Sequence, residues 1–413
     1  MNLIYIHQHF MTNAGAGGTR SYDVAKYMVQ AGHRVHMICG IYDISGLARM
    51  PWYRLFRRER IDGIDLTVCN VYYSNKLGAA KRMWSFFWFA FLATWAVLRS
   101  PRPDVVFATS TPLTVGIPGY LGARLRRKPF VFEVRDIWPE SLIRSGWVTG
   151  KELYIRMMER LEVFLYNRAK RILLVSPGFE TRLIERGFPA EKLKTILLGA
   201  EGDLFRQVTP DTQFIETQGL AGKTIAIYTG AHGKANGLDY IVEAAQHSRD
   251  RQDIAYVLIG EGMEKTRLKE LAKDKGLTNI VFADPVPKER LPGILAVCHI
   301  GLMILKDIGE PRPVTPNKIF DYMFMGMPAV VNFEGPTIEM VRAEGCGVLA
   351  DPKDPADLAA KVQSLADDRA WAHELGERGK KAAWQKYDRR MIAGELMAVF
   401  EAAARSPERV AEF

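Results

Sequence analysis

Several features that define other protein classes are scarce or missing in this chain of 413 residues. Only four cysteines occur, and no two form a Cys-x-x-Cys pair, which argues against a disulfide scaffold and a cysteine zinc site. The first ten residues, MNLIYIHQHF, lack the basic start and cleavage site of a secretory signal, and we expect them to form a strand. No low-complexity segment or short repeat is present, so we expect a globular chain of about two or three domains.

Charge is plentiful but unevenly distributed. The net charge of +9 divides into +14 for residues 1–200 and −5 for the remainder. A basic half is expected to face nucleic acid, an anionic membrane or a phosphorylated substrate. Since the chain has no nucleic-acid-binding motif, we expect no nucleic-acid partner and favour the other two.

Sixteen consecutive residues, 83–98 (MWSFFWFAFLATWAVL), carry no charge and are flanked by Lys and Arg. As a helix they would span roughly 24 Å, short of a ~30 Å hydrocarbon core. Aromatic rings favour the membrane interface and the flanking cations suit anionic headgroups, so we expect a monotopic helix on the membrane surface. A buried helix of the N-terminal sheet and a true span are the alternatives, and the basic stretch 50–60 is a second candidate contact. The expected membrane residues are Trp84, Phe87, Trp88, Phe91 and Trp95.

Short apolar strands alternate with helical stretches in both halves, which predicts parallel sheets with crossover helices. The strands expected in the first half are 3–8, 34–40, 65–71, 104–110, 130–134 and 171–176. The pattern restarts at 224–230 and continues at 255–260, 279–284, 299–305 and 328–333. We therefore predict two doubly wound α/β domains, 1–203 and 204–387, that face each other across a cleft. The last segment, 388–413, can pack on either domain, including back on the first.

A glycine-rich loop follows the first strand and opens a helix near Arg20. Its backbone amides and the positive end of the helix dipole suit an anion, and an arginine adds a bidentate phosphate donor. The spacing does not fit a dinucleotide fingerprint, so a phosphate site and a loop without a ligand both stay open. The candidate residues are Gly17, Gly18 and Arg20.

A polar cluster follows strand 130–134, at the strand end where α/β folds place active-site residues. It contains Arg135, Asp136 and Glu140. Either carboxylate can act as a base or orient a sugar hydroxyl. The alternative is an Asp–Arg pair that caps a helix.

The second half holds the residue types that a nucleotide diphosphate requires. Glycine-rich turns follow two expected strands, and the stretch 314–331 places a lysine in the first turn of a helix, against the helix dipole. A bound phosphate would compensate for that position. The candidate residues are Gly230, Lys234, Gly260, Glu261, Asn317 and Lys318.

Together these motifs resemble the family-4 retaining glycosyltransferases of the GT-B fold, and are most similar to a bacterial fucosamine-transferase-like branch of surface-polysaccharide biosynthesis. The motifs are GGTRSYDVAKYMVQAGHRVHMICG (17–40), VFEVRDIWPESLIRSGW (131–147), PNKIFDYMFMGMPAVV (316–331) and GPTIEMVRAEGCGVLADPKDPADLAAKV (335–362). The resemblance implies that the N-terminal domain takes the acceptor and the C-terminal domain takes a nucleotide sugar, with a UDP-sugar expected.

The resemblance also implies roles for single residues. Lys318 would contact the donor diphosphate, Asp321 the ribose or sugar, and Glu339 would lie near the donor. Pro285 and Val286 would bracket the base, and the residues of the glycine-rich loop would lie near the phosphates or the acceptor. The chain departs from the family pattern at three places: Pro313 replaces the first Glu of the Glu-x7-Glu motif, Ala231 and Asn236 replace the donor-loop Arg and Lys, and Arg135 replaces the usual His.

The implied reaction is a metal-independent transfer to a polyprenyl-diphosphate-linked glycan, with fixed cations and backbone amides stabilising the leaving diphosphate. No cofactor is expected, because the nucleotide sugar is a substrate. The expected location is the cytoplasmic face of the inner membrane, as a peripheral or monotopic protein. A nucleotide-sugar 2-epimerase of the same fold and a non-catalytic membrane-associated assembly component are the alternatives.

Overall fold

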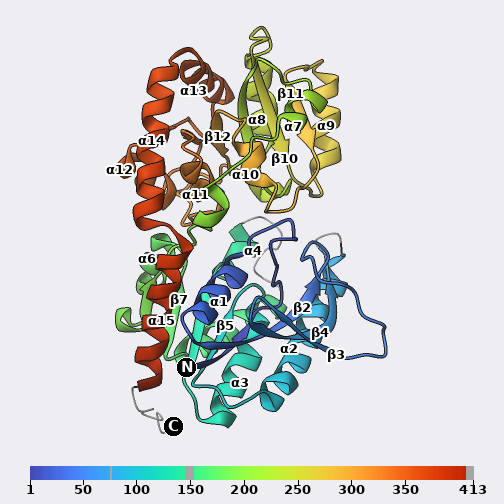
Figure 1. Ribbon diagram of the computed structural model, residues 1–413, viewed down its shortest axis with the longest axis vertical. Helices are drawn as coiled ribbons and strands as arrows, with labels where there is room; N and C mark the ends of the chain where they lie inside the picture. Colours follow the sequence, from blue (N-terminus) through green and yellow to red (C-terminus); the bar gives the residue numbers. More distant parts are fainter. Residues whose placement is uncertain (75–76, 145–152, 406–413) are drawn as a thin grey trace. The chain divides into compact units, whose positions relative to one another are not determined.

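The computed structural model describes residues 1–74, 77–144 and 153–405, which form two compact α/β units (Figure 1). Unit 1 contains Met1–Gly15, Thr19–Leu197 and helix α15 (Arg389–Arg405). Unit 2 contains Ala16–Gly18 and Leu198–Asp388. The sequence placed the boundaries at 203–204 and 387–388, and residues 406–413 of its last expected segment lie outside the described residues.

Unit 1 is built on an eight-stranded sheet in the order β3-β4-β2-β1-β5-β6-β7-β8. Neighbouring strands are parallel except for the edge pair β3 and β4, which is antiparallel. The strands are β1 (Asn2–Ile6), β2 (Arg34–Tyr42), β3 (Phe56–Ile61), β4 (Ile64–Tyr73), β5 (Val105–Thr109), β6 (Phe130–Val134), β7 (Arg171–Leu174) and β8 (Leu193–Thr195).

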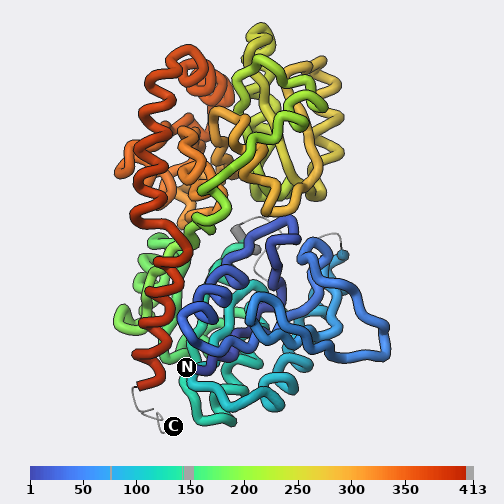
Figure 2. The backbone as a smooth tube through the Cα atoms, in the orientation of Figure 1, coloured from blue at the N-terminus to red at the C-terminus, as the bar shows by residue number. Residues whose placement is uncertain are grey.

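Helices cover both faces of this sheet. Helix α1 (Arg20–Gln30) and α15 pack on one face, where the ring of Phe400 of α15 packs at a tilted angle against that of Phe107 of β5. Figure 2 shows α15, drawn in red, running beside the blue helix α1. The first residue of α15, Arg389, is 1% exposed; its guanidinium pairs with Asp23 of α1 and donates to the Thr19 hydroxyl at 2.9 Å. This buried pair fixes the returning chain to the start of α1.

The opposite face is covered by α2 (Ala79–Arg99), α3 (Gly116–Arg126) and α5 (Leu153–Arg168). Three glycines of α3 permit close packing, because a Cβ atom at each would overlap a neighbouring side chain. Gly119 lies against Phe130 of the sheet, whereas the glycines one turn before and after it lie against α5 and α2. The remaining helices of unit 1 are α4 (Glu140–Arg144) and α6 (Pro177–Glu185).

Unit 2 has a six-stranded parallel sheet in the order β11-β10-β9-β12-β13-β14. The strands are β9 (Thr224–Thr229), β10 (Ile254–Ile259), β11 (Ile280–Ala283), β12 (Ile300–Met303), β13 (Ala329–Val331) and β14 (Gly347–Leu349). The helices are α7 (Thr212–Thr217), α8 (Asp239–His247), α9 (Lys265–Asp274), α10 (Leu291–Leu295), α11 (Lys318–Phe324), α12 (Pro336–Glu344), α13 (Pro355–Asp367) and α14 (Arg369–Lys386).

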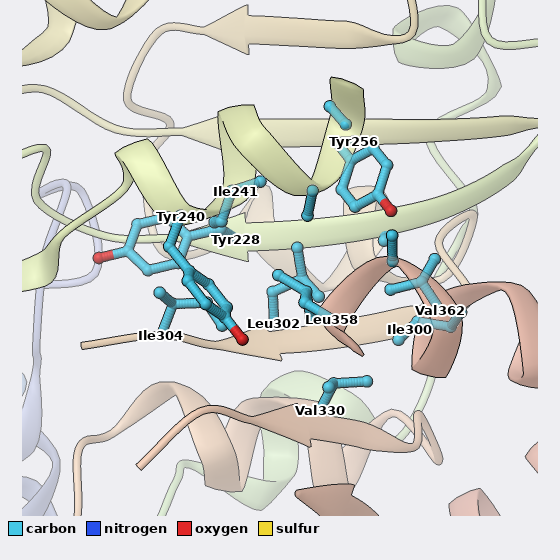
Figure 3. Close-up of a cluster of buried hydrophobic side chains, with 14 of the residues drawn as sticks. Tyr228, Tyr240, Ile241, Tyr256, Ile300, Leu302, Ile304, Val330, Leu358 and Val362 are labelled. Carbon is cyan, nitrogen blue, oxygen red and sulfur yellow. The ribbon is translucent and has the colours of Figure 1, made fainter. Parts of the chain in front are cut away.

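The core of unit 2 lies between the central strands and helices α8 and α13 (Figure 3). Fully buried aliphatic residues such as Ile241, Leu302 and Leu358 fill it, and Tyr228 and Tyr256 contribute large rings from the sheet. The central strands are continuous apolar runs because both of their faces are covered. Two doubly wound Rossmann-like units, as the sequence predicts, are therefore confirmed. Within the ranges described, no helix is both long and apolar enough to cross a bilayer.

Candidate active-site residues of the two units

A buried charge network lies at the carboxyl ends of the central strands of unit 1. Glu133 of β6 is fully buried and accepts hydrogen bonds from Arg20 Nη2 at 3.0 Å and from Arg135 Nε at 3.0 Å. Burial alone would raise the pKa of Glu133, but the two guanidinium groups outweigh it and lower the pKa to about 2. Glu133 is therefore an ionised carboxylate that organises two arginines.

Arg20 is a structural residue at this position, which corrects the expectation that its guanidinium is available to a phosphate. Its side chain is 1% exposed and is held by Glu133 on one side. Its Nη1 atom donates to the carbonyl oxygen of Leu197 at 2.6 Å, and Nη2 reaches that of Ile196. Arg20 therefore secures the last residues of unit 1 before the chain leaves it.

Asp136 directly follows Arg135 after the end of β6, but the two side chains differ in their hydrogen bonds. Arg135 is engaged with Glu133 and with the hydroxyl of Ser21, to which Nη2 donates at 2.8 Å. The carboxylate of Asp136 has no hydrogen-bond partner among the described residues. Burial raises the pKa of Asp136 to about 6, against the opposing charge of Arg135. Asp136 is thus a carboxylate that titrates near neutrality and is free to accept a hydrogen bond.

Glu140, the other predicted carboxylate, is the first residue of α4 and forms an ion pair with an arginine. Its Oε1 atom accepts from Arg182 of α6, with a shortest distance of 2.7 Å. The structure therefore does not bring Glu140 and Asp136 into one hydrogen-bonded pair.

The glycine-rich loop before α1 is shaped by close backbone contacts. A Cβ atom at Gly15 would lie 2.5 Å from the carbonyl oxygen of Ile44, so no larger residue fits there. Gly17 and Gly18 belong to the short segment Ala16–Gly18 that groups with unit 2. None of the three glycines has a positive φ, so close approach rather than left-handed backbone explains Gly15.

In unit 2, Lys318 is the residue predicted to contact a diphosphate, and its ammonium is placed over an aromatic ring. Its ammonium lies 3.6 Å from the centre of the Tyr228 ring, and a Cβ atom on Gly230 would come within 3.0 Å of Nζ. Within the described residues no carboxylate pairs with this ammonium, and burial lowers the pKa of Lys318 to about 7. Gly230 has a φ of +145°, which favours glycine at this turn. A cation supported by a ring face and left without an anionic partner is suited to bind an anionic ligand.

Asp321 lies one turn further along α11, but it is not at a ligand-accessible surface. It is 4% exposed, and its Oδ2 atom accepts from the ammonium of Lys288 at 2.6 Å. This buried ion pair corrects the expectation that the carboxylate contacts a ribose or a sugar. Its other oxygen, Oδ1, has no hydrogen-bond partner in the described part of the chain.

Lys234, the second candidate for the diphosphate, lines a separate cavity of about 460 Å³. Lys306, Lys353, Asp239 and Arg267 also line this cavity, whereas Lys318 does not. The structure therefore separates the two lysines that the sequence offered as substitutes for the missing donor-loop residues.

The turns after β10 and β11 hold further candidates. Gly260 has a φ of +155° and packs so closely on the carbonyl of Gly230 that a Cβ atom would overlap it. Glu261 is exposed, and its carbonyl oxygen accepts from the backbone amide of His232 at 2.9 Å. The other candidates occupy loop or surface positions: Pro285 and Val286 follow β11, Asn317 precedes α11, and Glu339 is exposed in the first turn of α12.

His232 was not singled out from the sequence, although it stands between glycines in the turn after β9. Its side chain is fully buried, and neither ring nitrogen has a hydrogen-bond partner among the described residues. Histidine in a glycine-rich turn at a strand's carboxyl end was the only available sequence signal.

The aromatic segment of unit 1 forms α2, which buries one face and exposes the other. Phe86, Phe89 and Val97 pack inward, so the helix covers the sheet as well as presenting aromatic residues outward. On the outer face Trp84 is 68% exposed and Phe91 60%. Rings of Trp84, Trp88 and Phe91 stack in sequence, with centroids 6.1 and 5.4 Å apart, and Arg99 lies 4.1 Å over the Trp95 ring. The remaining exposed aromatic on this face is Phe87.

Two family models match the chain. Residues 15–199 match the Glycosyl transferase 4-like domain, and residues 211–382 match Glycosyl transferases group 1. The chain belongs to the family-4-like glycosyltransferases. Across the described residues of this glycosyltransferase, no group of three or more His, Cys, Asp or Glu side chains is placed to hold a metal ion.

Relatives of this glycosyltransferase include two bacterial proteins. WbjE of Pseudomonas aeruginosa, described as a probable glycosyltransferase, is 25% identical over 272 residues, which cover 65% of this chain and 68% of WbjE. WcaI of Escherichia coli K12, described as a putative colanic acid biosynthesis glycosyl transferase, is 24% identical over 86% of this chain and 90% of its own.

Solved structures show the same fold. Anabaena Alr3699/HepE in complex with UDP and glucose is 18% identical, with a TM-score of 0.71 over 97% of this chain and 100% of that chain. Sucrose-phosphate synthase from Thermosynechococcus elongatus is 17% identical, with a TM-score of 0.75 over 97% and 98% of the two chains. These likenesses identify the fold of the glycosyltransferase as GT-B.

Proposed function

We propose that this glycosyltransferase transfers a sugar, with retention of configuration and without a metal, from a UDP-sugar to a polyprenyl-diphosphate-linked glycan. The pathway we infer is bacterial surface-polysaccharide synthesis, in the fucosamine-transferase-like branch. The described role of WcaI in colanic acid biosynthesis and the UDP bound to HepE support the pathway and the donor. The protein would act at the cytoplasmic face of the inner membrane, as a peripheral or monotopic protein.

The observation that carries this proposal is the ammonium of Lys318, which has a ring face beneath it and no carboxylate partner among the described residues. When the bond between the anomeric carbon and the leaving diphosphate oxygen breaks, negative charge grows on that diphosphate. A fixed cation stabilises this charge without reorganisation, which is often the largest contribution to catalysis. Lys318 would therefore act on the donor in unit 2.

Unit 1 would supply the group that orients the acceptor. The ionised carboxylate of Asp136 would accept a hydrogen bond from the acceptor sugar and so align its reacting hydroxyl, whose oxygen forms the new bond to the anomeric carbon. The hydroxyl proton would pass to the departing phosphate oxygen, so no enzyme nucleophile is needed. Burial raises the pKa of Asp136 to about 6, which keeps it ionised at neutral pH but basic enough to align the hydroxyl.

The outer face of α2 would hold the protein at the membrane where a lipid-linked acceptor resides. Its aromatic rings would lie at the bilayer interface, and Arg99 together with the basic residues in the first turn of the helix would face anionic headgroups. This arrangement gives the +14 half of the chain a role distinct from nucleotide binding.

A thermal-shift screen with UDP-, GDP- and ADP-sugars, followed by transfer to a polyprenyl-diphosphate acceptor in detergent, tests the proposal. We expect stabilisation by UDP-sugars and donor consumption that requires the acceptor. Donor turnover without acceptor would instead identify a 2-epimerase, and nucleotide-sugar binding without turnover would identify a non-catalytic component.

A further inference from the structure

His232 is a buried polar side chain for which the fold provides no hydrogen-bond partner. It is 0% exposed, and both Nδ1 and Nε2 are without partners among the described residues. Leaving buried polar atoms unpaired costs free energy, so such groups usually mark strain, a functional role or a missing partner. The imidazole is therefore a candidate ligand-binding group.

The backbone holds His232 in place between two turns. Its amide donates to the carbonyl oxygen of Glu261 at 2.9 Å, and its own carbonyl accepts from the amide of Glu264 at 3.0 Å. The ring lies between Tyr228 and Phe282, with centroids 6.3 Å from each. His232 therefore joins the loops that follow β9 and β10 and contacts β11 through its side chain.

Two glycines of the turn after β10 lie close to His232. A Cβ atom on Gly260 would lie 3.3 Å from Nε2, and Gly262 packs directly on the His232 backbone. Between these two glycines only Glu261 carries a side chain, and that side chain is exposed. The part of the turn that lies against Nε2 is therefore glycine backbone, and a ligand would have to move this backbone to reach the ring.

The imidazole is neutral at physiological pH. Burial and the nearby ammonium of Lys265 lower the pKa of His232 to about 4. A neutral ring offers one N–H donor and one nitrogen acceptor, which suits hydroxyl, amide or carbonyl groups better than a phosphate.

The neutral imidazole and the cation both lie near the ring of Tyr228, and the charge of Lys318 is among the causes that lower the pKa of His232. Lys318 follows β12 and lies over Tyr228 of β9, whereas the His232 ring contacts Phe282 of β11, on the opposite side of β9 in the sheet. The carboxyl edge of unit 2 thus presents a cation at one position and a neutral donor–acceptor group at the other. A nucleoside diphosphate has a matching arrangement, because its diphosphate is charged and its nucleoside is neutral.

We infer that His232 hydrogen-bonds the nucleoside half of the donor, while Lys318 contacts its diphosphate. The inference rests on the proposed function, since it assumes that the ligand of unit 2 is a nucleotide. His232 would then determine nucleoside affinity without contacting the reacting atoms.

Calorimetric titrations of the full chain with UDP and with inorganic pyrophosphate test this division. We expect His232→Phe to weaken UDP binding about tenfold and to leave pyrophosphate binding within twofold. Lys318→Ala should weaken both ligands. His232→Asn, which restores a donor and an acceptor, should recover part of the UDP affinity, and His373→Phe, on an exposed face of α14, is the matched control.

Unchanged UDP affinity in His232→Phe, or an equal loss for pyrophosphate, would overturn the inference while leaving the proposed function intact. Failure of the wild type to bind UDP, GDP or ADP would overturn both. Thermal melts check that each variant is folded. If the larger phenylalanine ring prevents folding, the UDP and pyrophosphate affinities are compared in His232→Leu instead.

Discussion

The ammonium of Lys318 and the ring of Tyr228 form a cation–π contact of 3.6 Å at the carboxyl edge of the unit 2 sheet. Burial lowers the pKa of Lys318 to about 7, so its charge is present below pH 7 and is lost as the pH rises through that value. The contact therefore holds a cation whose charge is easily removed, and binding of a diphosphate would favour the charged form.

Donor affinity should consequently depend on pH. We expect the Kd for UDP to rise by up to tenfold per pH unit above pH 7 in the wild type. Lys318→Arg retains its charge and should remove this rise, whereas Lys318→Ala should bind weakly at every pH. Lys353→Ala, which alters an exposed lysine of the same unit, is the control. A wild-type Kd that is constant from pH 6 to 9 would contradict the role of Lys318.

Asp136→Asn should lower the transfer rate by roughly 10²-fold or more, with UDP affinity unchanged, because a neutral amide oxygen is a weaker hydrogen-bond acceptor than a carboxylate. The wild-type rate should also fall as the pH drops below about 6, where Asp136 becomes protonated. Steady-state kinetics with varied acceptor measure both effects. Glu140 is already paired with Arg182, so Glu140→Gln should change the transfer rate far less than Asp136→Asn does.

The buried Glu133 should stabilise unit 1 in a pH-dependent way. Its folded pKa of about 2 lies below the unfolded value of ~4.3, so its stabilisation is present above pH ~4.3 and is lost as the pH falls toward 2. Glu133→Gln should reduce the free energy of unfolding by about 3–5 kcal/mol at pH 7, since it leaves Arg20 buried without its partner.

Urea denaturation at pH 7 and pH 3.5 measures this effect. The wild type should lose more stability between the two pH values than Glu133→Gln does. A double variant, Arg20→Met with Glu133→Leu, should be less destabilised than Glu133→Gln, because it removes the more deeply buried of the two guanidinium groups that would lose their carboxylate. Equal acid sensitivity of wild type and Glu133→Gln would show that Glu133 does not govern this transition.

The outer face of α2 should control membrane binding. Trp88→Asp/Phe91→Asp places two charges on the exposed aromatic face and should lower flotation with anionic liposomes several-fold. The control is Ile184→Asp/Met263→Asp, which alters two exposed apolar residues on α6 and in unit 2. Equal flotation of both double variants and the wild type would remove the membrane role of α2.

The sequence predicted the parallel strands well, because strands covered on both faces are continuous apolar runs. It missed the short parallel edge strands β8 and β14, and it missed β3, whose sequence FRRERI is rich in charge and shows no apolar run. The structure explains this composition, since β3 is an antiparallel edge strand and charged residues protect such edges from pairing with other chains.

The directions of individual side chains were less predictable than the elements that carry them. Arg20 follows a glycine-rich loop, as a phosphate ligand would, but its partner Glu133 lies 113 residues away in the sequence. Asp321 is similarly fixed by Lys288, 33 residues earlier. Local spacing contains no information about such distant partners, whereas the positions of Asp136, two residues after β6, and of Lys318, at the start of α11, follow from the local pattern.

The return of α15 to unit 1 also sets the order in which the two units become complete during synthesis. Unit 2, apart from Ala16–Gly18, is one continuous run that ends at Asp388, whereas unit 1 requires Arg389 and the residues after it. Until those last residues leave the ribosome, the surface around Phe107 that Phe400 covers has no partner helix, and Asp23 has no Arg389. The domain that is begun first is therefore the one that is finished last.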